Sequence, residues 1–159
     1  QNVGLSRSSL YESFGSKQGL FDQALGNYCR TNREGVKALL SNEKSVKTGI
    51  RNLLESSIHC TISDADKKGC FVVNSTTELV PGDDEMLKAL SKNRASFEKV
   101  FFEFLQKGQA TGEIPPNKDI KTLSGLIYTV FSGLNVIAKL EKSPKKLMAQ
   151  IDQIVGLLD

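Results

Sequence analysis

The chain has 159 residues, of which 39% are hydrophobic and 25% are charged, and its formal net charge is +3. These values are typical of a soluble globular protein with one good core, or with a small domain beside a larger one. The net charge is too small to indicate nucleic-acid binding by itself. Uninterrupted apolar runs are too short to span a membrane, and the first residues lack a signal-peptide pattern. We therefore expect a cytoplasmic protein with no membrane partner.

The segment 3–21 predicts the second half of a helix-turn-helix that leads into a long helix. Gly4 suits a tight turn because glycine tolerates positive φ, and Ser6 is a good N-cap for the residues that follow. Leu10 and Phe14 lie four residues apart, so they share one face of a short helix and can bury it. This segment is the only part of the chain whose chemistry indicates one class of partner, which is duplex DNA.

The polar residues of this short helix suit contact with DNA. Arg7, Ser8 and Ser9 lie at its N-terminal end, where short polar side chains and an arginine contact base edges and phosphates. Gly15 ends the helix, and Lys17 follows at the start of the next one. The helix dipole disfavours a cation at that place, and a nearby phosphate would compensate for it.

The run Val-Gly-Leu-Ser-x-x-x-Leu-Tyr-x-x-Phe-x-Ser-Lys-x-x-Leu resembles the signature of TetR-type (tetracycline-repressor-like) transcriptional regulators. The resemblance implies that Arg7, Ser8, Ser9, Tyr11 and Lys17 face double-stranded operator DNA, with Tyr11 and Lys17 mainly on phosphates. The alternative for Tyr11 is a core position in a helical hairpin. The resemblance also implies one helix and most of a second ahead of residue 1, so the chain is expected to be an N-terminally truncated fragment that binds DNA weakly by itself.

The rest of the chain predicts further helices, separated by polar, proline or glycine breaks. Hydrophobic spacing and capping residues predict helices over residues 16–40, 45–58, 70–79, 83–109, 119–140 and 143–158. The run Phe71-Val72-Val73 could form a strand on propensity alone, but its helical flanks favour a short helix. We expect an all-α, TetR-like fold. Residues 1–36 would hold the rest of the DNA-binding domain and a linker helix, and residues 37–159 an effector-binding and dimerisation domain.

The last two predicted helices carry more apolar surface than one side of a small monomer easily covers. The TetR resemblance implies a homodimer in which these helices pair with their symmetry mates in a four-helix bundle. A two-fold dimer is also what a palindromic operator requires. The alternative is that both helices are buried within one chain. The candidate interface residues are Ile127, Val130, Phe131, Leu134, Ile151, Ile154, Val155 and Leu158.

A small-molecule site is expected inside the helical domain. Mostly apolar walls with a few polar groups are typical of such sites, and aromatic side chains gather on two of the predicted helices. Packing alone is the simpler explanation for any single aromatic residue. The resemblance implies an effector bound in this domain, and we expect an aromatic or otherwise largely apolar ligand. The candidate pocket residues are His59, Cys70, Asn74, Phe97, Phe101, Phe104 and Tyr128.

Cys70 follows a glycine at the start of a predicted short helix. This Gly-Cys start resembles a subgroup of TetR-type regulators, some of which sense thiol-reactive electrophiles or oxidants. A cysteine near a helix N-terminus has a lowered pKa and a more reactive thiol, and Lys67 and Lys68 would act in the same direction. The apolar run that follows Cys70 favours the alternative, which is a buried and inert cysteine.

Catalytic chemistry and metal binding have little support in the sequence. His59 is the only histidine, and its neighbour Cys60 points about 100° away on a helix, so the two do not face each other. The cysteines have no metal-type spacing, and no cofactor is expected. The sequence predicts a transcriptional repressor released from its operator by a small apolar or electrophilic effector. The alternative is a helical ligand-binding or scaffold module without a DNA role.

Overall fold

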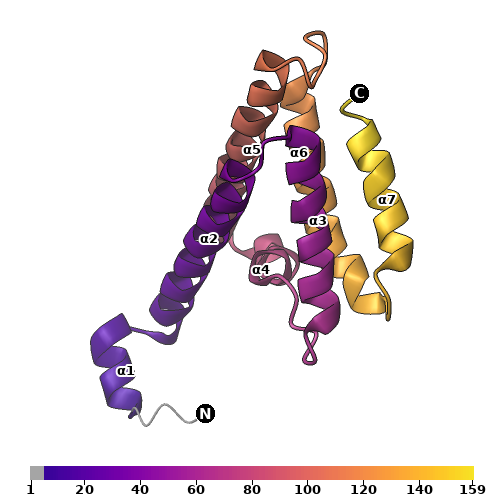
Figure 1. The fold of residues 1–159 in the computed structure, drawn as a ribbon. Coiled ribbons are helices and arrows are strands. Elements are labelled where there is room, and N and C mark those ends of the chain that lie inside the picture. The colour runs from indigo at the N-terminus through magenta and orange to yellow at the C-terminus, as the bar shows by residue number, and fades with distance from the viewer. Residues whose placement is uncertain (1–5) are drawn as a thin grey trace.

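The computed structural model describes residues 6–159, except for the side chain of Arg7, and it contains no strand within that range. Figure 1 shows the arrangement of its helices. The helices are α1 (Arg7–Phe14), α2 (Lys17–Ser41), α3 (Val46–Ser63), α4 (Phe71–Leu79), α5 (Asp84–Ala110), α6 (Ile120–Ile137) and α7 (Lys145–Gly156), with the 3₁₀ turns η1 (Val80–Gly82) and η2 (Ala138–Leu140). The all-α prediction is confirmed. The turn that contains Gly4 lies outside the described residues.

Most helices begin where a capping side chain predicts a start. The hydroxyls of Ser6, Ser16 and Ser45 accept hydrogen bonds from backbone N–H groups three residues later. The carboxylates of Asp83 and Asp119 do the same for α5 and α6. Each cap pairs a backbone donor that the first turn of a helix leaves free, which is why the local sequence was sufficient to place these ends.

The last helix starts one residue later than its sequence predicts. The pair Ser143-Pro144 predicts an N-cap followed by proline at the first helical position, but α7 begins at Lys145, and Pro144 occupies the cap position without a side-chain capping bond. The hydroxyl of Ser143 accepts from the Lys145 N–H at 3.4 Å, which is a long contact. The preference of proline for the start of a helix therefore located this end to within one residue.

The helices assemble around two adjoining cores. In Figure 1, α1 lies at the foot of α2, and α4 lies between α2 and the pair formed by α3 and α6. The main core joins α2, α3, α5, α6 and α7. The smaller core joins α2, α4 and α5 around Leu25, Cys70, Val72, Met86 and Leu90. Because α2 contributes to both cores, the helix that begins beside α1 is held along most of its length.

By length and composition alone, residues 120–140 could cross a membrane, with a mean hydropathy of 1.4. The sequence-based expectation that no segment could do so was therefore too strict. In the fold this segment packs along α5 and against α3, and Ile127, Phe131 and Leu134 belong to the main core. The apolar character of α6 is thus used in helix packing, with some apolar side chains left at the surface.

Candidate functional site

The short helix α1 presents polar side chains away from the rest of the molecule. Ser8 and Lys17 are exposed, Ser9 is half-buried, and the Tyr11 side chain has 51% of its surface exposed. Such exposure disfavours a core role for Tyr11 within the described residues and leaves its hydroxyl accessible. The side chain of Arg7 lies outside the described residues. Contact with DNA by this group stays a prediction.

The start of α2 fixes how α1 is held. Gly15 ends α1 with a φ of 72°, and its N–H donates to the Tyr11 carbonyl at 2.8 Å. A side chain at this left-handed position would be strained. Ser16 then caps α2 by accepting from the Gly19 N–H at 3.0 Å. One tight turn therefore sets the angle between the predicted reading helix and the long helix that carries it.

A cavity of about 360 Å³ lies between α2, α3, α6 and the start of α4. Its lining mixes apolar, hydroxyl, amide and thiol groups, which suits a small ligand with a few polar atoms. The lining residues are Tyr28, Thr31, Asn32, Gly35, Val36, Leu39, Leu53, Ser56, Ser57, Cys60, Thr61, Asp64, Gly69, Cys70, Phe131 and Asn135. We call this space the Cys70 cavity.

Cys70 and Tyr28 form the part of this cavity where α4 meets α2. Cys70 occupies the N-cap position of α4 and is buried. Burial and, to a smaller extent, the neighbouring Cys70 raise the pKa of the Tyr28 hydroxyl to about 12. Cys29 belongs to the same cluster, and burial followed by the influence of Cys70 raises the pKa of its thiol. The phenol of Tyr28 is therefore a neutral hydrogen-bonding group at any physiological pH.

The loop before Cys70 is folded by the carboxylate of Asp64. This side chain accepts from the N–H groups of Asp66 at 3.1 Å and Lys68 at 2.7 Å. Lys68 forms a 2.6 Å ion pair with Asp66, and the Lys67 ammonium donates to the backbone carbonyl of Lys139. Both lysines are thus engaged within the loop or with η2, rather than being free to act on the Cys70 thiol as their sequence position suggested.

Of the seven candidate pocket residues, Cys70 alone lines the Cys70 cavity. Phe97, Phe101 and Phe104 are buried in the main core, where Phe97 and Phe101 pack against Phe131. Their stripe is the packing face of α5, as the simpler explanation held. The cavity is therefore bounded by faces of α2, α3 and α6, and not by the aromatic face of α5 that the sequence suggested.

The other three candidates have identifiable places outside this cavity. His59 is exposed on α3, and Tyr128 is half-buried with its ring centroid 5.9 Å from that of Phe97. Asn74 donates to the Lys68 carbonyl at 2.9 Å and accepts from the Lys139 ammonium at 3.3 Å. Asn74 thereby ties the loop before Cys70 to α4 and η2.

The cavity residues that sequence reasoning missed carry a recognisable signal. On α2 and α3 they recur at helical spacing, as a stripe of small or polar side chains where a packed helix would have large apolar ones. On α2 the stripe is Thr31, Asn32 and Gly35, and on α3 it is Ser56, Ser57, Cys60 and Thr61; the larger Tyr28, Val36, Leu39 and Leu53 border it. Two such stripes that face each other leave a space, because short side chains cannot fill it.

Most of the candidate dimer residues are buried within a single chain. Ile127, Phe131, Leu134, Ile151, Val155 and Leu158 are buried in the main core, and Val130 and Ile154 are half-buried against it. The apolar side chains that this end of the chain leaves exposed are different ones, namely Leu126, Val136, Ile137, Leu140 and Leu157.

The sequence and the fold both match known regulators. Residues 47–154 match the family model described as "Tetracyclin repressor-like, C-terminal domain". The chain belongs to the TetR family of transcriptional regulators. It is 31% identical over 155 residues to the HTH-type transcriptional repressor ComR of Escherichia coli, a match that covers 97% of this chain and 72% of ComR. It is 26% identical to the uncharacterized HTH-type transcriptional regulator YezE of Bacillus subtilis, covering 99% and 82%.

Solved TetR-family structures have the same arrangement of helices. A cysteine variant of CifR in complex with a 26-bp double-strand operator DNA superposes with a TM-score of 0.85 at 28% identity, covering 98% of this chain and 81% of CifR. The reduced form of NemR from E. coli superposes with a TM-score of 0.79 at 18% identity, covering 98% and 81%, which shows likeness of fold. This TetR-family chain is thus a DNA-binding transcriptional regulator.

Proposed function

We propose that this TetR-family protein is a ligand-responsive repressor, and that a small apolar or electrophilic effector occupies the Cys70 cavity and releases the protein from its operator. The observation that carries the proposal is that one helix, α2, both lines the cavity and begins beside α1. Tyr28 and Val36 of α2 line the cavity, and Lys17 at the start of the same helix lies beside α1. Two similar proteins support the same role: ComR is a transcriptional repressor, and CifR was solved in complex with operator DNA.

The mechanism is a shift between two positions of α2. Lys17 and Tyr28 are eleven residues apart, or roughly 16 Å along the helix, so a small tilt at the cavity is enlarged at α1. An effector favours release only to the extent that it binds the released position more tightly than the DNA-bound one. Because the cavity lies between α2 and α3, its volume depends on the angle of α2, which gives the effector such a preference.

Operator reading also requires two copies of the protein. We infer a homodimer formed through α6, η2 and α7, because these elements leave apolar side chains exposed at one end of the chain. Leu140 has 78% of its surface exposed, and Leu126 and Ile137 lie on α6 at helical spacing from it. In a two-fold dimer the two copies of α1 would meet successive major grooves of a palindromic site.

The electrophile version of the proposal rests on the position of Cys70. Its thiol is covered from bulk solvent but lies on the cavity wall, so a small reagent would reach it only by entering the cavity. Alkylation adds a group inside a space of about 360 Å³ and would press α4 away from α2. In the apolar-ligand version Cys70 is an inert part of the wall, and a reversible ligand fills the same space.

The test is operator release by the full-length protein. DNA binding is measured by fluorescence anisotropy on the duplex upstream of its gene, before and after treatment with N-ethylmaleimide. We expect loss of binding in the wild type and in the control Cys60→Ser, and retained binding in Cys70→Ser. Release of Cys70→Ser by the reagent would remove the electrophile version. Failure of the untreated protein to bind any such duplex at low salt would favour a ligand-binding module without a DNA role.

A further inference from the structure

A second and larger cleft lies on a different face of α2, where this helix runs beside α5. Its volume is about 830 Å³, within the range of small-molecule sites. It is lined by Gln18, Asp22, Leu25, Gly26, Cys29 and Arg33 of α2, and by Asp83, Glu85, Met86, Ala89, Leu90, Lys92, Asn93 and Ser96 of α5 and its cap. None of these residues lines the Cys70 cavity. We call this space the α2–α5 cleft.

Asn93 lies at the floor of the α2–α5 cleft with its amide unpaired. Its side chain is 6% exposed, and neither its Nδ2 nor its Oδ1 has a hydrogen-bond partner among the described residues. Its neighbours along the floor, Leu25, Met86 and Leu90, are apolar and also buried. Buried amides are nearly always paired, because an unpaired donor and acceptor lose their bonds to water. The Asn93 amide is therefore able to donate one hydrogen bond and accept another from a molecule that enters the cleft.

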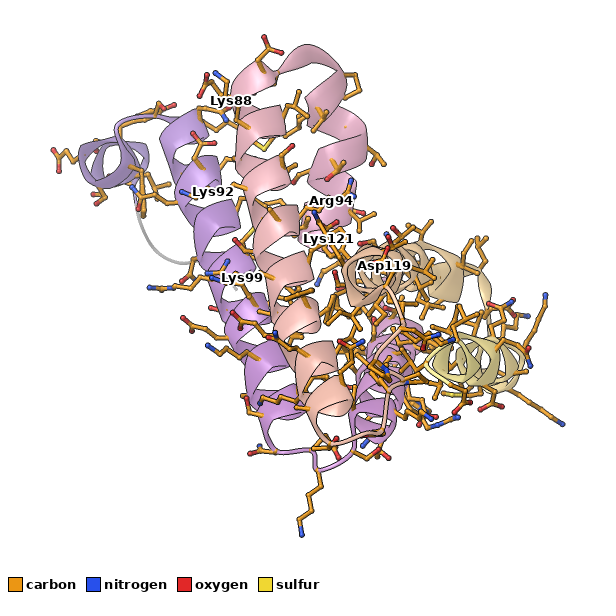
Figure 2. All side chains as sticks on the ribbon, turned by 90° about the horizontal axis from the view of Figure 1, so that it is seen from above. Lys88, Lys92, Arg94, Lys99, Asp119 and Lys121 are labelled. Carbon is orange, nitrogen blue, oxygen red and sulfur yellow. The ribbon has the colours of Figure 1, made fainter. Side chains whose placement is uncertain are left out.

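The cations of the cleft are also free of carboxylate partners. Neither Arg33 nor Lys92 forms a salt bridge with any side chain that the structure describes. Figure 2 shows Lys92 on the side of α5 toward α2, in line with Lys88 and Lys99, whereas Arg94 points to the opposite side of the helix. Arg33 is close enough to Cys29 to oppose the rise that burial causes in the pKa of that thiol. Two cations for which the structure describes no carboxylate partner thus line the same cleft as the unpaired amide.

The acidic residues of the cleft already have partners. Asp83 accepts from the Met86 N–H at 2.9 Å as the cap of α5. Glu85 pairs with Lys88 at 2.6 Å, and Asp22 accepts from Gln18 at 2.8 Å. These three carboxylates lie toward the start of α2 and α5, whereas Arg33 and Asn93 lie about two to three turns further along. The groups of the cleft that lack a partner within residues 6–159, the Arg33 guanidinium and the Asn93 amide, therefore lie further along the two helices than its carboxylates.

We propose that the α2–α5 cleft binds a small organic acid that carries a hydrogen-bond donor next to its carboxylate. The carboxylate accepts from the Arg33 guanidinium and from Asn93 Nδ2, and a hydroxyl or N–H group donates to Asn93 Oδ1. An apolar body rests on the floor formed by Leu25, Met86 and Leu90. Arginine suits this role because its planar fork matches a carboxylate in two parallel bonds. This site goes beyond the proposed function, since it is separate from the Cys70 cavity.

The test uses mandelate, which combines a carboxylate, an adjacent hydroxyl and a phenyl ring. Binding is measured by isothermal titration calorimetry on this chain without DNA. Phenylacetate, which lacks the hydroxyl, and 1-phenylethane-1,2-diol, which lacks the carboxylate, are the matched probes. We expect mandelate to bind with a Kd below about 1 mM and both probes to bind at least about tenfold more weakly, because each loses a bond to a buried or charged group.

Two variants and their matched controls locate the site. Asn93→Leu keeps the branched shape of the side chain and removes both unpaired groups, so we expect weaker mandelate binding by at least about tenfold and a thermal midpoint about 2–6 °C higher without ligand. Arg33→Gln should weaken binding to a similar degree. Asn32→Leu, on the wall of the Cys70 cavity, and Arg30→Gln, which is exposed on α2, should leave mandelate binding unchanged.

The outcomes separate cleanly. Binding that is lost in Arg33→Gln and Asn93→Leu but kept in both controls supports the proposal. Absence of binding up to about 10 mM mandelate, or binding that survives both substitutions, overturns it. Arg33→Gln decides alone if Asn93→Leu does not fold, because Arg33 is only half-buried and belongs to neither core. No DNA enters the assay, so its result is independent of operator release through the Cys70 cavity.

Discussion

The ring of Phe71 stands edge-on to the ring of Tyr28, with centroids 5.7 Å apart and planes at 78°. Phe71 meets Phe21 in the same manner at 5.3 Å and 86°. The first residue of α4 therefore contacts α2 at two positions that lie about two turns apart, and it directly follows Cys70. Any displacement of the start of α4 must move these rings, so Phe71 is the most direct link between the Cys70 cavity and the helix that carries α1.

Replacing Phe71 by leucine should uncouple the cavity from DNA release. Each aromatic pair contributes about 0.5–1.5 kcal/mol beyond its buried area, so Phe71→Leu should lower the thermal midpoint by about 3–6 °C. Phe71→Leu should reduce the loss of operator affinity that the effector causes. Operator affinity without effector should change less. Calorimetry measures the thermal midpoint, and fluorescence anisotropy measures operator affinity with and without effector. The control Phe102→Leu alters a half-buried ring that packs on the main core, and it should reduce stability without changing the response. An equal response in both variants would contradict the link.

Glu113 gives the fold a defined response to acid. Its carboxylate accepts from the Ser45 hydroxyl at 2.6 Å and from the N–H groups of Val46 at 2.7 Å and Lys47 at 2.9 Å. Partial burial acts against the charged form, but these hydrogen bonds outweigh it and hold the pKa of Glu113 below 4.5. A lowered pKa in the folded state means that the stabilisation is present above 4.5 and is lost as the pH falls through the folded value.

Glu113→Gln should therefore destabilise the protein at neutral pH but not in acid. We expect a loss of about 1–2 kcal/mol in the free energy of unfolding at pH 7, as for removal of a helix cap. The difference from the wild type should shrink steadily below pH 4.5, where the wild-type carboxylate becomes protonated. Urea unfolding from pH 7 to pH 3 measures it. Glu34→Gln, at an exposed position on α2, should show no such trend, and a constant difference for Glu113→Gln would be the contrary result.

The contrast between Ser45 and Glu113 explains how far the sequence could predict this molecule. Ser45 caps α3 through the Thr48 N–H, three residues away, and such local bonds placed most helix starts correctly, whereas the predicted end of α3 at residue 58 falls short of Ser63. The second partner at the same helix end is Glu113, which is 68 residues away from Ser45, and no local pattern connects the two. The Cys70 cavity has the same origin, because it is bounded by faces of α2, α3 and α6 whose mutual orientation only the packed structure defines.

Two glycines in different helices should respond in opposite directions to alanine. A Cβ atom added at Gly49 of α3 would lie 2.6 Å from Cζ of Phe104, whereas one added at Gly26 of α2 would have no atom within 4 Å. Gly49→Ala should cost about 1–3 kcal/mol because the core is already filled there. Gly26→Ala should stabilise by about 0.5–1 kcal/mol, since alanine loses less backbone freedom in a helix. Urea unfolding distinguishes them, and a neutral Gly49→Ala would mean that Phe104 can move aside.

Placing a charge at Leu140 should separate the proposed dimer without unfolding either subunit. The side chain is 78% exposed in one chain, so Leu140→Glu removes little burial from the monomer. Within a dimer the same carboxylate would be buried without a partner, which is strongly unfavourable. Sedimentation velocity at micromolar concentration should show a dimer for the wild type and a monomer for Leu140→Glu. Leu87→Glu, on the exposed face of α5, should stay dimeric. A monomeric wild type would contradict the dimer itself.

Lys17 is expected to contact a DNA phosphate, which has a signature in the salt dependence of binding. Each lysine–phosphate contact contributes about −0.9 to the slope of log Kobs against log salt. Lys17→Gln in both subunits of a dimer should therefore reduce the steepness of that slope by about 2 and weaken binding to all sequences alike. The comparison is Lys44→Gln, an exposed lysine in the turn between α2 and α3 and far along the chain from α1. If both substitutions change the slope equally, Lys17 acts through overall charge and not through a bound phosphate.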